Sequence, residues 1–117
     1  MSAARDPLYL TLIGEAIADI HRRFGDQAFD AFLSDRDEQA LAAFRLSIIG
    51  ENANKLSADV RARHPGIPWA DMVAFRNIVS HEYHRIDPAL VWEALNALDE
   101  IAAMVDDELD KHIGQGG

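Results

Sequence analysis

Apolar residues recur every three or four positions along most of the chain, which is the spacing of one face of an α-helix. Four stretches are long enough to be main helices, a shorter one lies between the second and the third, and no stretch has the period of a β-strand. Residues 26–33 are expected to be a short helix or turn. The predicted helices are residues 6–24, 34–56, 57–64 and 69–80, and a last helix that begins at 87 and carries apolar residues to 109.

Polar residues mark where these helices begin. Asp6 and Asp87 each stand before a proline, which is tolerated in the first helical turn, and an aspartate there can accept from free helix N–H groups. Ser34-Asp35 opens the second helix with acidic residues in its first turn. The fold predicted from these elements is all-α, an up-and-down four-helix bundle with a short additional helix. We expect one domain over residues 1–117, with loose ends at 1–5 and 113–117.

The apolar positions also indicate which side each helix buries. In the second helix the expected stripe is Leu41, Phe44 and Ile48, flanked by Ala40, Leu46 and Ile49. Glu51 lies near the same side one turn further on. The stretch 69–80 is apolar on several sides, which is typical of a buried helix. In a chain of this size, one way to bury such a helix is to pack it against a partner subunit.

Composition narrows the class of protein. With 117 residues and 49% hydrophobic content the chain can form a real core, and the absence of cysteine excludes disulfides, thiolate metal sites and thiol catalysis. Acidic residues interrupt the first apolar stretch, so it does not resemble a signal peptide, and no apolar run has the length of a membrane span. The sequence therefore predicts a cytoplasmic protein without a membrane partner.

Charge is distributed unevenly. The net charge of −9 at pH 7 argues against a general nucleic-acid binder, which needs clustered lysine and arginine. Residues 61–85 nevertheless carry four arginines against two acidic residues, together with three of the five histidines. This basic window is either a local phosphate-binding surface or a chance consequence of acidic helix faces elsewhere.

The polar chemistry concentrates in Arg76-x4-His81-x-Tyr83. On a regular helix, residues five apart diverge by about 140°, so Arg76 and His81 do not share one face. Either the helix ends near Ser80 and His81 swings round, or each residue meets partners from a second chain. Arginine matches phosphate geometry and histidine moves protons near neutral pH, a combination that suits RNA phosphodiester cleavage, with hydrogen bonds from Asn77 and Ser80.

A structural reading of the same residues is also open. Arg76 could pair with Glu51 or Glu82 inside the bundle, and His81 could cap a helix end. His81 and His84 are three apart, so they miss the H-E-x-x-H spacing of a zinc helix, and we expect no metal and no cofactor. Trp69 and Trp92 are expected to be core or interface anchors.

Several segments resemble one family along nearly the whole chain. Arg76-x4-His81-x-Tyr83 is similar to the signature of the HepT-like branch of the HEPN superfamily. Further similar segments are Asp6-Pro7-Leu8-Tyr9-Leu10, Ile48-Ile49-Gly50-Glu51-Asn52-Ala53, His64-Pro65-Gly66-Ile67-Pro68-Trp69 and Ile86-Asp87-Pro88-Ala89-Leu90-Val91-Trp92.

This resemblance implies a HEPN-like homodimer in which the motifs of two chains face each other across a cleft. It implies metal-independent RNA cleavage by the toxin of a toxin–antitoxin system, with Arg76 and His81 as catalytic residues. The supporting residues expected from the sequence itself are Asn77 and Ser80, through hydrogen bonds, and Glu51, on a polar patch shared with the Arg76 region. The implied partner is a minimal nucleotidyltransferase antitoxin that transfers AMP to Tyr83. The alternative is a non-catalytic helical dimer that serves as a partner or substrate of such a nucleotidyltransferase.

Overall fold

The chain is helical throughout the part that a computed structural model describes, which is the backbone of residues 3–116 and the side chains of residues 3–112. No strand occurs within those residues, so the predicted all-α class is confirmed. The α-helices are α1 (Asp6–Phe24), α2 (Phe29–Leu33), α3 (Arg36–Lys55), α4 (Ala58–Arg63), α5 (Trp69–His81), α6 (Pro88–Leu95) and α7 (Asp99–Gly116). Two 3₁₀ turns are η1 (Ala3–Arg5) and η2 (Tyr83–Arg85).

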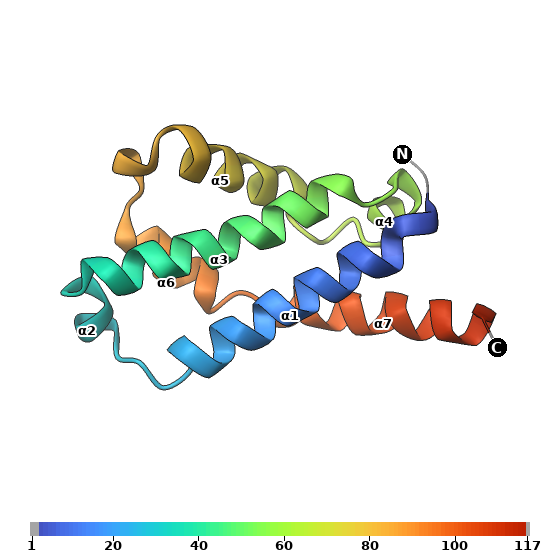
Figure 1. The fold of residues 1–117 in the computed structure, drawn as a ribbon, viewed down its shortest axis with the longest axis horizontal. Coiled ribbons are helices and arrows are strands. Elements are labelled where there is room, and N and C mark those ends of the chain that lie inside the picture. Colours follow the sequence, from blue (N-terminus) through green and yellow to red (C-terminus); the bar gives the residue numbers. More distant parts are fainter. Residues whose placement is uncertain (1–2, 117) are drawn as a thin grey trace.

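The long helices run up and down along the longest axis of the molecule (Figure 1). α1 packs between α3 and α7, while α5 packs almost entirely on the other side of α3. The molecule measures 48 × 29 × 21 Å, and the start of α1 and the end of α7 lie at the same end (Figure 1). None of the described helices is long and apolar enough to cross a membrane.

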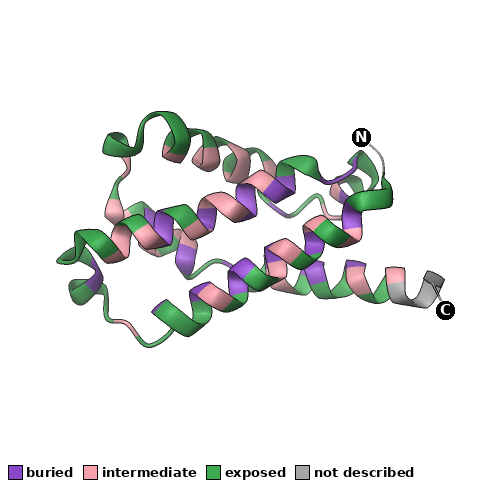
Figure 2. Ribbon diagram, viewed as in Figure 1, coloured by how far each residue is buried: buried purple, intermediate pink, exposed green. Residues whose placement is uncertain are grey.

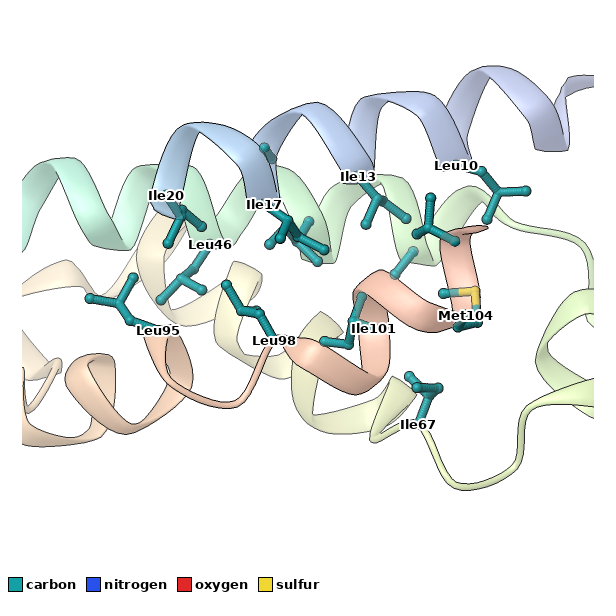
Figure 3. Close-up of a cluster of buried hydrophobic side chains, with 14 of the residues drawn as sticks. Leu10, Ile13, Ile17, Ile20, Leu46, Ile67, Leu95, Leu98, Ile101 and Met104 are labelled. Carbon is teal, nitrogen blue, oxygen red and sulfur yellow. The ribbon is translucent and has the colours of Figure 1, made fainter. Parts of the chain in front are cut away.

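The core lies where α1, α3 and α7 meet. The buried face of α1 contributes Leu10, Ile13, Ile17 and Ile20, whose spacing is that of one helix face (Figure 3). Each fully buried aliphatic side chain stabilises the fold by about 1.5–3 kcal/mol. This face therefore supplies a large part of the stability. The facing elements are α3, α6, α7 and the α6–α7 connection, and they contribute Leu46, Leu95, Leu98, Ile101, Met104 and Val105.

The buried stripe of α3 is centred on the predicted flank, Leu46 and Ile49, and not on the predicted stripe itself. Ala42, Leu46, Ile49 and Ala53 face the core, whereas Phe44 leaves 58% of its surface exposed. Both sets have helical spacing, and alanines give a weak apolar signal although they let neighbouring helices approach closely. Leu41 and Ile48 are only partly buried against the core, and the prediction was wrong for Phe44, because it followed the larger side chains.

The predicted last helix is two helices, α6 and α7, separated by residues 96–98. Asn96 ends α6: its backbone N–H and its side-chain amide both donate to the Trp92 carbonyl, the amide at 2.9 Å. Asparagine is a common helix terminator. The prediction of one helix was wrong because Val91, Leu95, Leu98 and Ile101 all stay buried across the break, so the apolar pattern does not register it.

The described ends of the chain are helical. Residues 3–5 form η1 and α7 continues to Gly116, while residues 1, 2 and 117 lie outside the described residues. Asp6 does not cap α1 as expected, because it is the first residue of the helix and its side chain bonds elsewhere. Its buried carboxylate accepts from the backbone N–H of Ser57 at 2.9 Å and from the Ser57 hydroxyl at 2.6 Å, which fastens the start of α1 to the start of α4.

Gly50 sets the distance between α3 and α5. A β-carbon on Gly50 would clash with the backbone carbonyl oxygen of Met72 and lie 3.0 Å from the β-carbon of Arg76. Only a residue without a side chain lets the two backbones cross at this separation. The crossing also places Arg76 beside the residue that follows Gly50, which is Glu51.

We expect Gly50→Ala to destabilise the fold, because the added methyl group must push α5 away from α3. The loss should be roughly 1–3 kcal/mol in the free energy of unfolding. The matched control is Gly14→Ala in α1, where the added β-carbon meets Val105 at an ordinary 3.4 Å. The control should be neutral or stabilising by up to about 1 kcal/mol. Urea denaturation followed by circular dichroism measures both, and a Gly50→Ala protein as stable as the control would contradict this account.

Candidate functional site

Helix α5 carries the predicted site and is the least buried of the long helices (Figure 2). None of its residues is fully buried. The residues that face α3 are half-buried, and the residues on the outer side are exposed to solvent. The predicted burial of 69–80 is thus absent within a single chain. The exposed outer residues are Ala70, Asp71, Ala74, Asn77, Ile78, Ser80 and His81.

Arg76 is held by two of the residues that were predicted to support it. Its Nε donates to the Glu51 carboxylate, and its Nη1 donates to Asn77 Oδ1 at 2.9 Å. Both charged side chains remain partly open to solvent, 34% for Arg76 and 38% for Glu51. The pairing of Arg76 with Glu51 that the sequence left open does occur. Glu82 pairs with Arg85 instead, at 2.9 Å.

His81 is the last residue of α5, and the helix is regular up to it. Its side chain therefore diverges from Arg76 by about 140°. The possibility that the helix ends early and His81 swings round is ruled out for this chain. The side chain of His81 is exposed and makes no hydrogen bond or ion pair with another described residue, so it does not cap the helix. Ser80, one turn after Arg76 and nearer to its side, is also exposed.

Tyr83 lies just beyond α5, in η2. It leaves 45% of its surface exposed, and its hydroxyl makes no hydrogen bond with the described residues. The side chain borders a groove of ≈ 580 Å³ that also contacts Arg36, Asp37 and His84. The hydroxyl is therefore accessible to a reagent or enzyme from outside.

These residues can do chemistry on a phosphodiester, although one chain does not bring all of them together. Glu51, Asn77 and Arg76 form one connected group, and the guanidinium offers charge-assisted hydrogen bonds to a phosphate. His81 offers an imidazole for proton transfer on a different side of the helix. What is missing in a single chain is a histidine next to the arginine.

A second polar cluster, at the junction of α4 and α7, was not predicted. The Glu108 carboxylate is fully buried and accepts from Arg63 at 2.7 and 3.0 Å and lies 2.7 Å from His64 Nε2. Lys111 approaches to 3.4 Å. The signal for this cluster was present in the sequence, because Glu108 interrupts the apolar stripe of the last helix, one turn after Met104 and Val105.

His64, Asp107 and Glu108 place three possible metal-ligand atoms within 4.8 Å of one another. Both carboxylates already have a cationic partner, however. Arg63 bonds both oxygens of Glu108, and Lys111 pairs with Asp107 at 3.0 Å. The hydrogen bonds from Arg63, with help from His64, lower the pKa of Glu108 from near 4.5 to about 2 despite its burial. The cluster is a structural tie between α4 and α7.

The described part of the chain is all-helical, and comparison with known proteins identifies its family. The family model described as Ribonuclease HepT-like matches residues 13–107. The chain belongs to this HepT-like ribonuclease family, which confirms the resemblance found in the sequence.

Individual relatives support this family assignment. A Thermococcus cleftensis protein named as a probable ribonuclease HepT is 33% identical over 87 residues, covering 74% of this chain and 79% of that protein. A Methanocaldococcus jannaschii protein named "putative RNase" is 30% identical over 104 residues, covering 85% of this chain and 86% of that protein. A Caldanaerobacter subterraneus protein with the same kind of name is 28% identical over 85 residues, covering 72% and 76%. No solved structure gave a significant match.

We expect Glu108→Gln to destabilise the protein by roughly 2–3 kcal/mol at neutral pH, because Arg63 loses a buried charged partner. A carboxylate with a lowered pKa stabilises the fold fully above its unfolded pKa and loses this effect as pH falls through its folded pKa. The stability difference from wild type should therefore be constant above pH 4.5 and shrink as the pH falls toward 2.

Thermal or urea unfolding at a series of pH values measures this difference. The control is Glu15→Gln, an exposed glutamate in the middle of α1, which should have little effect at any pH. A Glu108→Gln penalty that is as large at pH 3 as at pH 7 would contradict the assignment.

Proposed function

We propose that this protein is a metal-independent endoribonuclease and the toxin of a toxin–antitoxin system, acting on RNA in the cytoplasm. The observation that carries the proposal is the pairing of Arg76 with Glu51 and Asn77 on an open helix, with His81 exposed and unpartnered among the described residues at the end of that helix. Membership of the HepT-like ribonuclease family supports the choice of RNA as substrate.

The proposed reaction needs only groups that this chain carries. The RNA 2′ oxygen attacks the adjacent phosphorus and loses its proton, and the bond from phosphorus to the 5′ oxygen breaks as that oxygen gains a proton. His81 handles one or both of these protons. Arg76 binds the phosphate oxygens while negative charge builds up on them. Glu51 and Asn77 keep the guanidinium in one orientation, and Ser80 offers a hydroxyl to the substrate.

The proposed working unit is a homodimer. The regular course of α5 keeps His81 away from Arg76 of the same chain, so a complete site needs a second copy. The exposed second half of α5 supports this, because Ile78, three residues before His81, is an apolar side chain that leaves 38% of its surface open to solvent. In a two-fold pair, the same surface of each chain meets its copy, which brings His81 of one chain toward Arg76 of the other.

The proposed regulation acts on Tyr83, through a minimal nucleotidyltransferase as antitoxin. The tyrosine hydroxyl loses its proton to solvent or to a base of the nucleotidyltransferase as its oxygen attacks the α-phosphorus of ATP. Pyrophosphate leaves, and the tyrosine carries AMP. The exposed hydroxyl two residues beyond His81 supports this role. The added phosphate and adenosine place negative charge and bulk where the RNA phosphate would bind, which blocks the site.

A second candidate function is a non-catalytic dimer that is only the partner or substrate of such a nucleotidyltransferase. The net charge of −9 favours it, because such a charge weakens RNA binding outside the basic window.

The two candidates separate on RNA cleavage. We expect the purified protein to cleave RNA in EDTA and His81→Ala to lower the rate by about 100-fold or more. His21→Ala, which removes an exposed histidine of α1, is the control and should cleave at the wild-type rate. Gel filtration should show the same oligomeric state for all three proteins. Equal cleavage by wild type and His81→Ala would rule out the proposed mechanism, and no cleavage by wild type favours the second candidate.

Modification of Tyr83 has its own test. After co-expression with a cognate nucleotidyltransferase, intact-mass spectrometry should show a gain in AMP-sized steps, and RNA cleavage should fall. Tyr83→Phe should show no gain because it lacks the accepting hydroxyl. The matched control is Tyr9→Phe, which removes the other tyrosine of the chain and should be modified like wild type. AMP-sized gain on Tyr83→Phe would show that the acceptor is another residue.

A further inference from the structure

A pocket of ≈ 460 Å³ opens beside Arg76, and residues from the end of α3, from α4 and from α5 line it. Asn54, Arg61, Trp69 and Asn77 line it, and alanine and valine side chains of α5 complete its wall. Its volume falls within the roughly 300–1,000 Å³ of pockets that hold small organic ligands. The pocket adjoins the candidate site directly, because Asn77 both lines it and accepts from Arg76.

Trp69 gives the pocket an aromatic wall that is fixed in place. Its indole N–H donates to the His64 carbonyl at 2.9 Å, so the polar group of the side chain is already satisfied. What the half-buried ring contributes to the pocket is apolar ring surface. Aromatic rings of this kind stack on nucleobases, and they do so with any base.

The polar groups of the pocket suit the edge of a base and its phosphate. The side-chain amides of Asn54 and Asn77 have N–H groups without a partner among the described residues, and carboxamides pair readily with base edges. Arg61 is held at the wall by hydrogen bonds from its Nη2 to the Ala53 and Asn54 carbonyls at 3.1 and 2.6 Å. It brings a fixed positive charge.

The wall of this pocket also differs from that of other pockets in its charged residues. Three other pockets in the described part of the chain each have at least one acidic residue in the wall: Asp71 and Glu93, Asp99, and Asp37. The pocket beside Arg76 has none. In a chain of net charge −9, a wall with an arginine and no carboxylate is compatible with a polyanion.

We infer that this pocket is a nucleobase subsite, which stacks one RNA base on Trp69 while the neighbouring phosphate binds Arg76. The inference rests on the proposed RNA cleavage and adds to it a place where the enzyme contacts a base. Asn54 and Asn77 are the residues that would favour one base over another.

Fluorescence tests the subsite without cleavage. In a Trp92→Phe protein, Trp69 is the single tryptophan, and the probe is a short RNA in which every 2′ oxygen is methylated, so that no nucleophile is present. The probe should quench Trp69 emission to saturation. Asn54→Ala in this background should weaken the apparent affinity about 5-fold or more. Thr11→Ala, an exposed polar change on α1, should not. A Trp69→Phe protein, which keeps only Trp92, should show no quenching.

The outcomes separate this inference from the proposed function. Cleavage of RNA with unchanged Trp69 emission and unaltered affinity of Asn54→Ala would overturn the subsite and leave the ribonuclease proposal intact. Quenching that Asn54→Ala weakens, in a protein that does not cleave RNA, would support the subsite and overturn the cleavage. Absence of both quenching and cleavage would overturn both.

Discussion

The crossing of α3 and α5 at Gly50 is the contact on which the rest of the candidate site depends. Because Gly50 has no side chain, the backbone of α5 comes close enough for Arg76 to bond Glu51, the next residue of α3. The same contact fixes the rotation of α5 and hence which of its residues face solvent. A side chain at this position would change the separation of the helices and the position of the guanidinium together.

The core and the candidate site are formed by different helices. Helices α1, α3 and α7 form the apolar core, and the buried Glu108 network and the Asp6–Ser57 hydrogen bonds fasten α4 to them. Helix α5 adds little to this core and leaves its outer side exposed. A helix that is apolar on several sides and yet not buried is consistent with an interface that a single chain does not complete.

The sequence was enough to predict the all-α class and the starts of most helices, because periodicity and capping residues are local signals. It left the partner of Arg76 open between Glu51 and Glu82, and packing of α5 on α3 selects Glu51. The sequence failed where tertiary packing decides which side of a helix is buried and where a helix breaks. Phe44 has the size and spacing of a core residue but lies on the open side of α3, since alanines at 42 and 53 face the core instead. The break at Asn96 is invisible because the buried stripe continues across it. Glu108 carried a signal that was overlooked, a carboxylate on an apolar stripe.

The central claim is that Arg76 and His81 of different chains form one site. The direct measurement is RNA cleavage by co-expressed Arg76→Ala and His81→Ala chains, each inactive alone. If the site is shared, each mixed dimer contains one intact site and one doubly defective site, so random pairing should restore about a quarter of the wild-type activity. If each chain supplies both residues to its own site, no mixed dimer contains an intact site. Cleavage by the mixture would then stay at the level of the single variants, and this result would contradict the account.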